Sequence, residues 1–186
     1  SISGDVSVTN VKGEVRAETV SGDVNVSAAA NVAIAKTISG DVTAQNVSAQ
    51  TTLVLSTISG TVLGTGLKVR ALEAGSVSGN VRLVGSDVEG LEAKSLSGNI
   101  EFEAPLTKGG RYEFTSHSGN VGLRLSGNTG FDLDADTFSG SVRSDVPVTL
   151  RAIGQAEQNR RGSNRAIRGS YGDASAFLSV RSHSGS

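Results

Sequence analysis

Acidic residues recur at one position of a repeated pattern in this 186-residue chain. Each stands five residues before a Ser-Gly dipeptide, and the members are Glu73, Glu92, Glu113 and Asp134. If successive repeats stack on one another, neighbouring carboxylates in this column lie about 4.8 Å apart. Asp132 and Asp136 stand two residues to either side of Asp134, so an extended chain presents them on the same outward face.

Two kinds of chemistry need carboxylates at this spacing. A retaining glycosidase uses a pair about 5 Å apart, and Ca²⁺ is bound through several oxygen ligands. Lys94 and Arg111 are expected beside the column, where they neutralise part of it. We therefore favour a solvated, charge-mixed face, and we predict no catalytic residue, no metal ligand and no cofactor. The residues kept as a partner or cation surface are Glu73, Glu92, Glu113, Asp132, Asp134 and Asp136.

Other functional classes find little support in the residues. The chain has no Cys, which excludes disulfides and zinc sites of the Cys type. His117 and His183 occupy the same repeat position, but we expect a long insertion to separate their repeats. With 17 basic and 18 acidic residues and no basic stripe, nucleic acid is not an expected partner. No apolar run reaches the 18 or so residues of a membrane span.

The repeat itself is marked by Ser-Gly about every 20 residues. The Ser positions are Ser3, Ser21, Ser39, Ser59, Ser78, Ser97, Ser118, Ser139 and Ser184. A small polar residue follows each Gly, and a β-branched residue follows that in eight repeats: Val6, Val24, Val42, Val62, Val81, Ile100, Val121 and Val142. Gly at a fixed position is typical of a turn that requires positive φ.

The residues before each Ser alternate, as in a half-buried strand. Apolar residues stand six and four positions before it, and a Thr or Ser stands two before, for example Leu53, Leu55 and Thr57. We predict that these hydroxyls point inward at the corner, where backbone groups need partners. The residue directly before Ser is apolar or His. Strict alternation would expose it, but we favour a corner that turns it inward.

These patterns predict an all-β, single-domain parallel β-helix or β-solenoid of about nine rungs, each 18–21 residues long. We expect a right-handed coil. Residues 1–149 would form the regular rungs, residues 150–175 a polar Gly- and Arg-rich loop insertion, and residues 176–186 a closing strand of the same solenoid.

Two segments carry a resemblance to a known family: Ala17-Glu-Thr-Val-Ser-Gly-Asp-Val24 and Ala35-Lys-Thr-Ile-Ser-Gly-Asp-Val42. They resemble the Ser-Gly-Asp-Val repeats of bacterial β-strand-repeat proteins named as candidate adhesins. The ending Phe177-Leu-Ser-Val-Arg-Ser-His-Ser-Gly185 is similar to the ending of that family. The resemblance implies a β-helix, and it implies export or display at the bacterial cell surface. Thr61 and Ser141 depart from the pattern, which usually has Asp or Asn there.

We therefore expect a non-catalytic, extracellular or cell-surface protein with a structural or adhesive role. It would bind itself by head-to-tail stacking into filaments, or bind other surface proteins or glycans. Two alternatives remain: a carbohydrate-active enzyme, lyase or hydrolase, that uses the acidic column, and an intracellular polymerising scaffold of the bactofilin type. The chain has no Met, so we expect that a signal or anchor segment lies outside this sequence.

Overall fold

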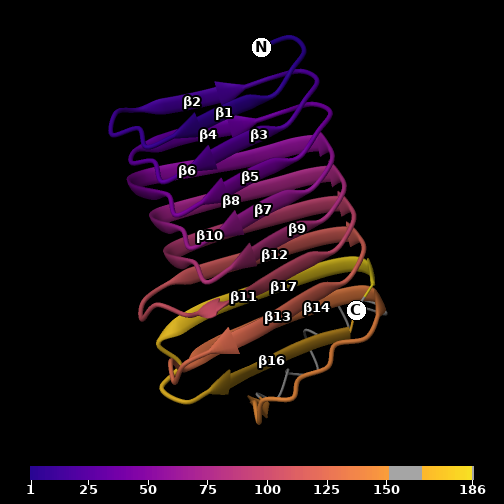
Figure 1. Ribbon diagram of the computed structural model, residues 1–186. Helices are drawn as coiled ribbons and strands as arrows, with labels where there is room; N and C mark the ends of the chain where they lie inside the picture. Colours follow the sequence, from indigo (N-terminus) through magenta and orange to yellow (C-terminus); the bar gives the residue numbers. More distant parts are fainter. Residues whose placement is uncertain (151–164, 186) are drawn as a thin grey trace.

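The computed structural model describes residues 1–150 and 165–185, and in them the chain coils into two facing β-sheets (Figure 1). Sheet 1 has seven strands in spatial order: β1 (Val6–Thr9), β3 (Val24–Ser27), β5 (Val42–Gln45), β7 (Val62–Thr65), β9 (Val81–Val84), β11 (Ile100–Pro105) and β13 (Val121–Ser126). Sheet 2 begins, from the amino-terminal end, with β2 (Val15–Glu18), β4 (Val32–Lys36), β6 (Ser48–Ser59), β8 (Lys68–Ser78), β10 (Asp87–Ser97) and β12 (Arg111–Ser118). It continues with β17 (Ala176–Gly185), β14 (Phe131–Gly140), β16 (Arg165–Tyr171) and β15 (Thr149–Leu150).

Equivalent residues of successive coils lie side by side, which confirms the predicted parallel β-solenoid. In sheet 1, Val6 pairs with Val24, Val24 with Val42, and Val42 with Val62. The same column continues through Val81, Ile100 and Val121. Because a coil shares its apolar face with the coils above and below, the stack buries one continuous core.

The Ser-Gly corners also stack, and their glycines cannot be replaced by larger residues without strain. Gly60 has φ +146, a conformation that residues with a Cβ rarely adopt. A Cβ on Gly60 would stand 2.1 Å from the carbonyl oxygen of Gly40 in the preceding coil. The predicted need for positive φ is confirmed, and close backbone approach between coils adds a second reason for glycine.

The hydroxyls two residues before each Ser point inward, as predicted. The hydroxyl of Thr37 donates to the carbonyl of Gly22 at 2.9 Å, and that of Thr57 donates to Gly40 at 2.9 Å. Thr19, Ser76 and Ser95 make the equivalent bond to the glycine of the preceding coil. These bonds satisfy carbonyl groups that the tight corner would otherwise leave buried and unpaired.

Aromatic residues fill the core where the coils are longest. Phe102, Tyr112 and Phe114 are fully buried, with ring centroids 5.5 and 5.8 Å apart around Phe102. The Tyr112 hydroxyl donates to the carbonyl of Val88 at 2.7 Å and accepts from the amide of Thr107 at 2.8 Å. The ring therefore adds apolar volume while its polar end satisfies two backbone groups.

The carboxyl-terminal part differs from the sequence prediction. Residues 176–185 form β17, but this strand lies inside sheet 2 between β12 and β14 and does not close the array. Residues 165–171, expected in a loop, form β16, which pairs antiparallel with β14. Residues 172–175 form the turn before β17, and residues 151–164 of the expected loop lie outside the described residues. Figure 1 shows yellow β17 between β12 and orange β14.

The rung count therefore depends on which side is counted. All nine Ser-Gly corners stack in one column, but in the order Ser118, Ser184, Ser139 at the carboxyl-terminal end. Within residues 1–150 and 165–185, sheet 1 has seven strands, because β16 of sheet 2 and not a sheet 1 strand precedes β17. Val142, expected in the β-branched column, follows β14 outside the strands and packs partly buried against the core.

Among the described residues, the chain forms no helix long and apolar enough to cross a membrane.

Candidate functional site

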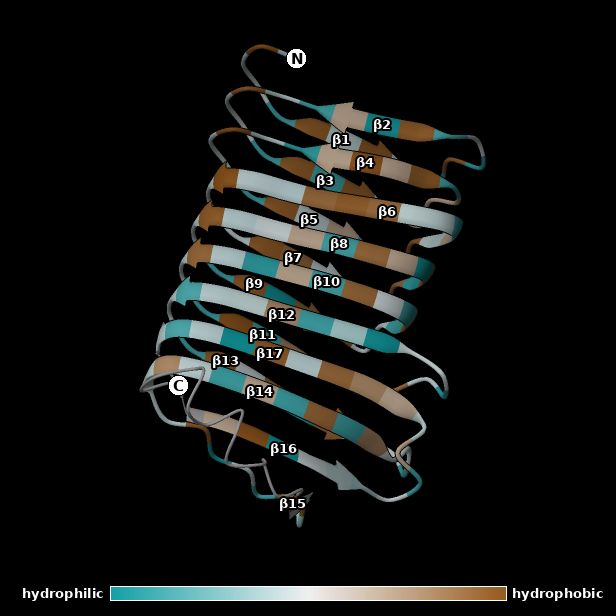
Figure 2. Cartoon of the chain, turned by 180° about the vertical axis from the view of Figure 1, so that it is seen from behind, coloured by the Kyte–Doolittle hydropathy of each residue, from teal (hydrophilic) through white to brown (hydrophobic). Residues whose placement is uncertain are grey.

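The residue before each Ser-Gly forms a line along one corner of the solenoid, which we call the corner ladder. In spatial order it consists of Ile2, Val20, Ile38, Ile58, Val77, Leu96, His117, His183 and Phe138. Figure 2 shows it as brown ends of β6, β8 and β10, followed by teal ends of β12 and β17. The ladder thus runs the whole length of the stack.

The corner ladder is exposed, and the inward orientation that we favoured is wrong. Ile38 and Val77 are 42% exposed, and Leu96 and Phe138 are 53% exposed. The strands of sheet 2 stay extended up to the Ser of the Ser-Gly corner, as in β6 and β8. The alternation of inward and outward side chains therefore continues beyond the buried Thr or Ser that precedes the ladder residue. The ladder side chain must then point outward.

Three aromatic rings complete the ladder at its carboxyl-terminal end. His117 stacks on His183 with centroids 4.7 Å apart and planes 5° apart, and Phe138 stacks on His183 at 4.9 Å and 2°. We expected an insertion to keep the two histidines apart. The inserted position of β17 instead makes them direct neighbours, because Ser118 pairs with Ser184.

The acidic column is shorter than the sequence predicts. Glu73, Glu92 and Glu113 are in register on β8, β10 and β12. Asp134 does not follow them, because β17 places Ser179 between Glu113 and Asp134. Ser179 is buried, so the column is interrupted by a short side chain. Glu113 and Asp134 therefore do not pair, whereas Glu73, Glu92 and Glu113 remain neighbours on adjacent strands.

Basic residues neutralise the acidic column, as predicted. Lys94 contacts Glu92, and this hydrogen bond raises the pKa of Lys94 above its usual 10.5. Arg111 lies 3.0 Å from Glu113 and also covers the ring of Phe177 at 5.0 Å. The interactions are at the surface, where such pairs contribute about 0–1 kcal/mol each.

The remaining acidic residues lie on β14, away from that column. Asp134 pairs with Arg168 of β16 at 3.2 Å, and Asp132 and Asp136 lie on the same strand next to residues of β17. Within residues 1–150 and 165–185, no group of three or more His, Asp or Glu side chains is arranged to hold a metal ion. The six predicted surface residues therefore form two separate charged areas.

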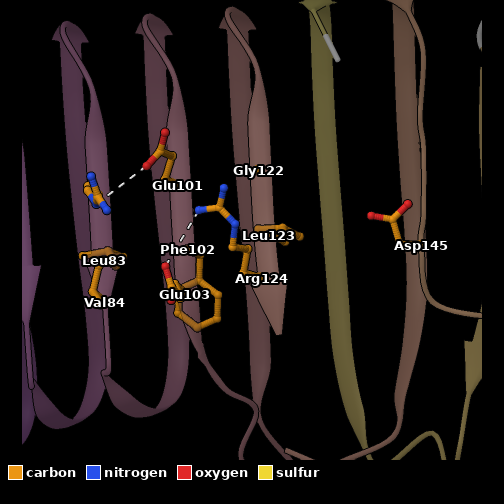
Figure 3. A pocket seen from close by; sticks show the side chains of 10 residues that line it. Leu83, Val84, Glu101, Phe102, Glu103, Gly122, Leu123, Arg124 and Asp145 are labelled. Atoms are coloured by element: carbon orange, nitrogen blue, oxygen red, sulfur yellow. Dashed lines mark ion pairs between the residues drawn. The ribbon is translucent and has the colours of Figure 1, made fainter. Parts of the chain in front are cut away.

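A shallow groove of about 260 Å³ lies on the outer face of sheet 1, and sequence reasoning missed it. Gly122 on β13 pairs with Glu101 on β11, so the missing side chain leaves a hollow beside Glu101. Figure 3 shows its charged rim, in which Glu101 pairs with Arg82 at 3.7 Å and Glu103 with Arg124 at 3.8 Å. Gly122, a glycine within a strand pattern, was the sequence feature that could have indicated this groove.

A second ladder, of Asp and Asn side chains, follows the Ser-Gly corner. Asp5 accepts a hydrogen bond from the amide of Asp23 at 2.9 Å, and Asp23 accepts one from Asp41 at 2.8 Å. Asn80 and Asn99 act in the same way toward the next coil. This column, which the sequence showed only as small and polar, therefore has a structural role in holding successive corners together.

Comparison with known families agrees with this architecture. The sequence profile of the Toastrack DUF4097 family matches residues 14–186. The chain belongs to this family. The match covers the inserted strand β17 as well as the regular coils of this Toastrack domain. No curated protein and no solved structure matches the chain.

Proposed function

We propose that this Toastrack domain is a non-catalytic structural or adhesive element of the cell surface or extracellular space, and that the corner ladder is its contact surface. The observation that carries the proposal is the exposure of apolar side chains at every coil from Val20 to Leu96. Single exposed apolar residues are common, but a continuous line of them at one corner of a domain is typical of a contact site.

The chemistry beside the ladder favours another protein as its occupant. On one side lie the short, exposed Ser side chains of the corners, which leave the ladder projecting. On the other side, the central coils carry Ser56 and Gly75, with Lys36 and Lys94 further along. Glu18 lies on the same side, so the charges beside the ridge largely cancel. A narrow apolar ridge with little net charge beside it fits an apolar protein surface better than a charged polymer.

The expected energy is enough for a specific contact. Full burial of one aliphatic side chain contributes about 1.5–3 kcal/mol, and half-exposed residues such as Ile38, Ile58, Val77 and Leu96 retain about 1 kcal/mol each for binding. Changing these four residues to Ser removes about 4 kcal/mol and should therefore weaken the complex on the order of 1,000-fold.

The control replaces apolar residues on the opposite sheet. Leu63 and Val84 point outward from sheet 1 and are half-buried, so Leu63→Ser and Val84→Ser remove apolar surface without touching the ladder. Both variants should bind as the unchanged chain does.

The test places a photo-crosslinker on Ile58→Cys, and on Leu63→Cys as control, in the full-length protein on native cells. The domain has no other Cys, so the labelling site within it is unique. A protein that crosslinks at position 58 but not 63, and whose affinity falls in the four-residue variant, supports the proposal. Crosslinks at 63 equal to those at 58, or unchanged affinity of the variant, would contradict it.

The extracellular location is tested separately on intact cells. Protease added outside should cleave the full-length protein before the cells are lysed, while a cytoplasmic marker stays intact. Protection of the protein until lysis would contradict this part of the proposal and would favour the intracellular scaffold.

A further inference from the structure

Strand β17 lies next to β12, a position whose repeat pattern β14 of the same chain also matches. Both β17 and β14 carry the repeat pattern, with Leu178 and Leu133, Val180 and Ala135, and Ser184 and Ser139 at equivalent positions. In every earlier coil, the next strand of sheet 2 pairs directly with its predecessor. Here β14 is moved one place outward, and the terminal strand fills the space.

The path to that space is a tight turn of residues 172–175 between β16 and β17. It crosses the start of β14 so closely that a Cβ on Gly130 would stand 2.3 Å from the amide of Asp173. Gly172 has φ +60 and Ala174 has φ +51, so the turn requires two residues in the left-handed region. Ala174 is strained there because it carries a Cβ.

Hydrogen bonding is also incomplete at this place. The hydroxyls of Thr137 on β14 and Ser182 on β17 are buried without a hydrogen-bond partner in the described part of the chain. The equivalent hydroxyls of earlier coils donate to glycine carbonyls, as Thr37 does. An unpaired buried hydroxyl weakens the contact of β17 with its neighbours, so the stack should open here more easily than elsewhere.

We propose that two copies of this chain exchange β17, so that the strand of one copy lies between β12 and β14 of the other. The exchanged strand makes the same contacts as before, because the receiving site is identical. The turn extends on exchange, which releases the strain at Ala174, and short strained connections favour such swapping. The open site exposes two strand edges that only an equivalent strand fills in register.

The test uses single cysteines, for which this chain without Cys is a clean background. Thr115 on β12 pairs with Arg181 on β17, and both side chains are exposed. The T115C and R181C proteins are mixed, concentrated with mild denaturant, returned to buffer and oxidised. A disulfide between positions 115 and 181 then joins two copies only where strands have been exchanged.

If strands are exchanged, the yield of the 115–181 heterodimer should be at least fivefold higher than the yields of the 115–115 and 181–181 dimers. The matched control is K36C mixed with R181C, because Lys36 lies on β4 at the equivalent exposed position but far from β17. Equal yields from the two mixtures, or dimers in random proportion, would overturn the proposal. If β17 leaves and β14 of the same chain then pairs directly with β12, no 115–181 heterodimer forms. That outcome also contradicts the proposal.

A second variant tests the origin of the exchange. Ala174→Gly removes the Cβ that strains the closed turn, so the exchanged fraction should fall roughly five- to tenfold. An unchanged fraction in this variant would contradict the assigned role of the turn. Neither result bears on the corner ladder, whose contacts lie outside the turn, so this proposal and the proposed function fail independently.

Discussion

The imidazole of His117 lies face to face with that of His183, 4.7 Å away, although β12 and β17 are far apart in the sequence. This contact exists because the terminal strand enters the sheet between β12 and β14. It joins the aliphatic part of the corner ladder to Phe138, which stacks on the other face of His183. The insertion of one strand therefore completes the surface that we propose for binding.

The glycines of the Ser-Gly corners should be the most sensitive positions of the backbone. Gly60→Ala places a Cβ 2.1 Å from the carbonyl oxygen of Gly40, at φ +146, and should lower the free energy of unfolding by about 3 kcal/mol or more. Gly85→Ala is the control, since Gly85 has φ +58 and nothing within 4 Å of its Cβ position. It should cost about 1 kcal/mol, as measured by urea denaturation. Equal losses would contradict the stacked corner.

The corner hydroxyls should differ according to whether they have an acceptor. Thr37→Val removes a buried bond to the carbonyl of Gly22 and should destabilise the chain by about 1–2 kcal/mol. Thr137→Val removes a buried hydroxyl that has no partner in the described residues, so it should be neutral or stabilising. Urea denaturation of both variants gives the comparison, and a larger loss for Thr137→Val would refute the assignment.

Tyr112→Phe should reveal the cost of two unpaired backbone groups in the core. The change keeps the ring among Phe102 and Phe114 but leaves the carbonyl of Val88 and the amide of Thr107 without their partner. We expect a loss of about 2 kcal/mol in the free energy of unfolding. Tyr171→Phe, which retains the ring contact with Phe131, is the control and should change stability by less than about 0.5 kcal/mol.

The turn before β17 should open in acid. Hydrogen bonds from Ser175 and Lys108 hold the pKa of Asp173 below its usual 3.8. Because the folded-state pKa is the lower one, the contribution of Asp173 is fully present above the usual value and is lost as pH falls through the folded pKa. Hydrogen exchange at the Gly130 amide, which donates to Asp173, should therefore show more frequent opening at low pH. In Asp173→Asn this additional pH dependence should vanish, and its persistence would assign it to another group.

The sequence was sufficient to predict the coils because each repeat determines its own local geometry. Three features depend only on neighbours in the same or adjacent coil: the corner Gly, the Thr or Ser three residues before it, and the alternating apolar residues. These rules placed Val6, Val24 and Val42 in one column and the hydroxyls of Thr37 and Thr57 inside, as the structure shows.

The same rules could not predict the order of the last strands. The segments around Ser139 and Ser184 carry equally good repeat patterns, so either could follow β12. The order is determined by the path of residues 165–175, which the local pattern does not describe. The acidic column was predicted on the assumption that successive strands pair in chain order. That assumption wrongly placed Asp134 beside Glu113. The exposure of the corner ladder was missed for a different reason, the assumption that an apolar side chain at a corner turns inward.

The position of β17 can be tested directly with paired cysteines in one chain. Adjacent strands bring outward residues within the range of a disulfide, so Thr115→Cys with Arg181→Cys should oxidise readily in dilute monomer. The control pair, Thr115→Cys with Asp136→Cys, spans two strand spacings across β17 and should stay reduced. Rapid oxidation of the control pair instead, with 115 and 181 left as free thiols, would place β14 beside β12 and contradict the account.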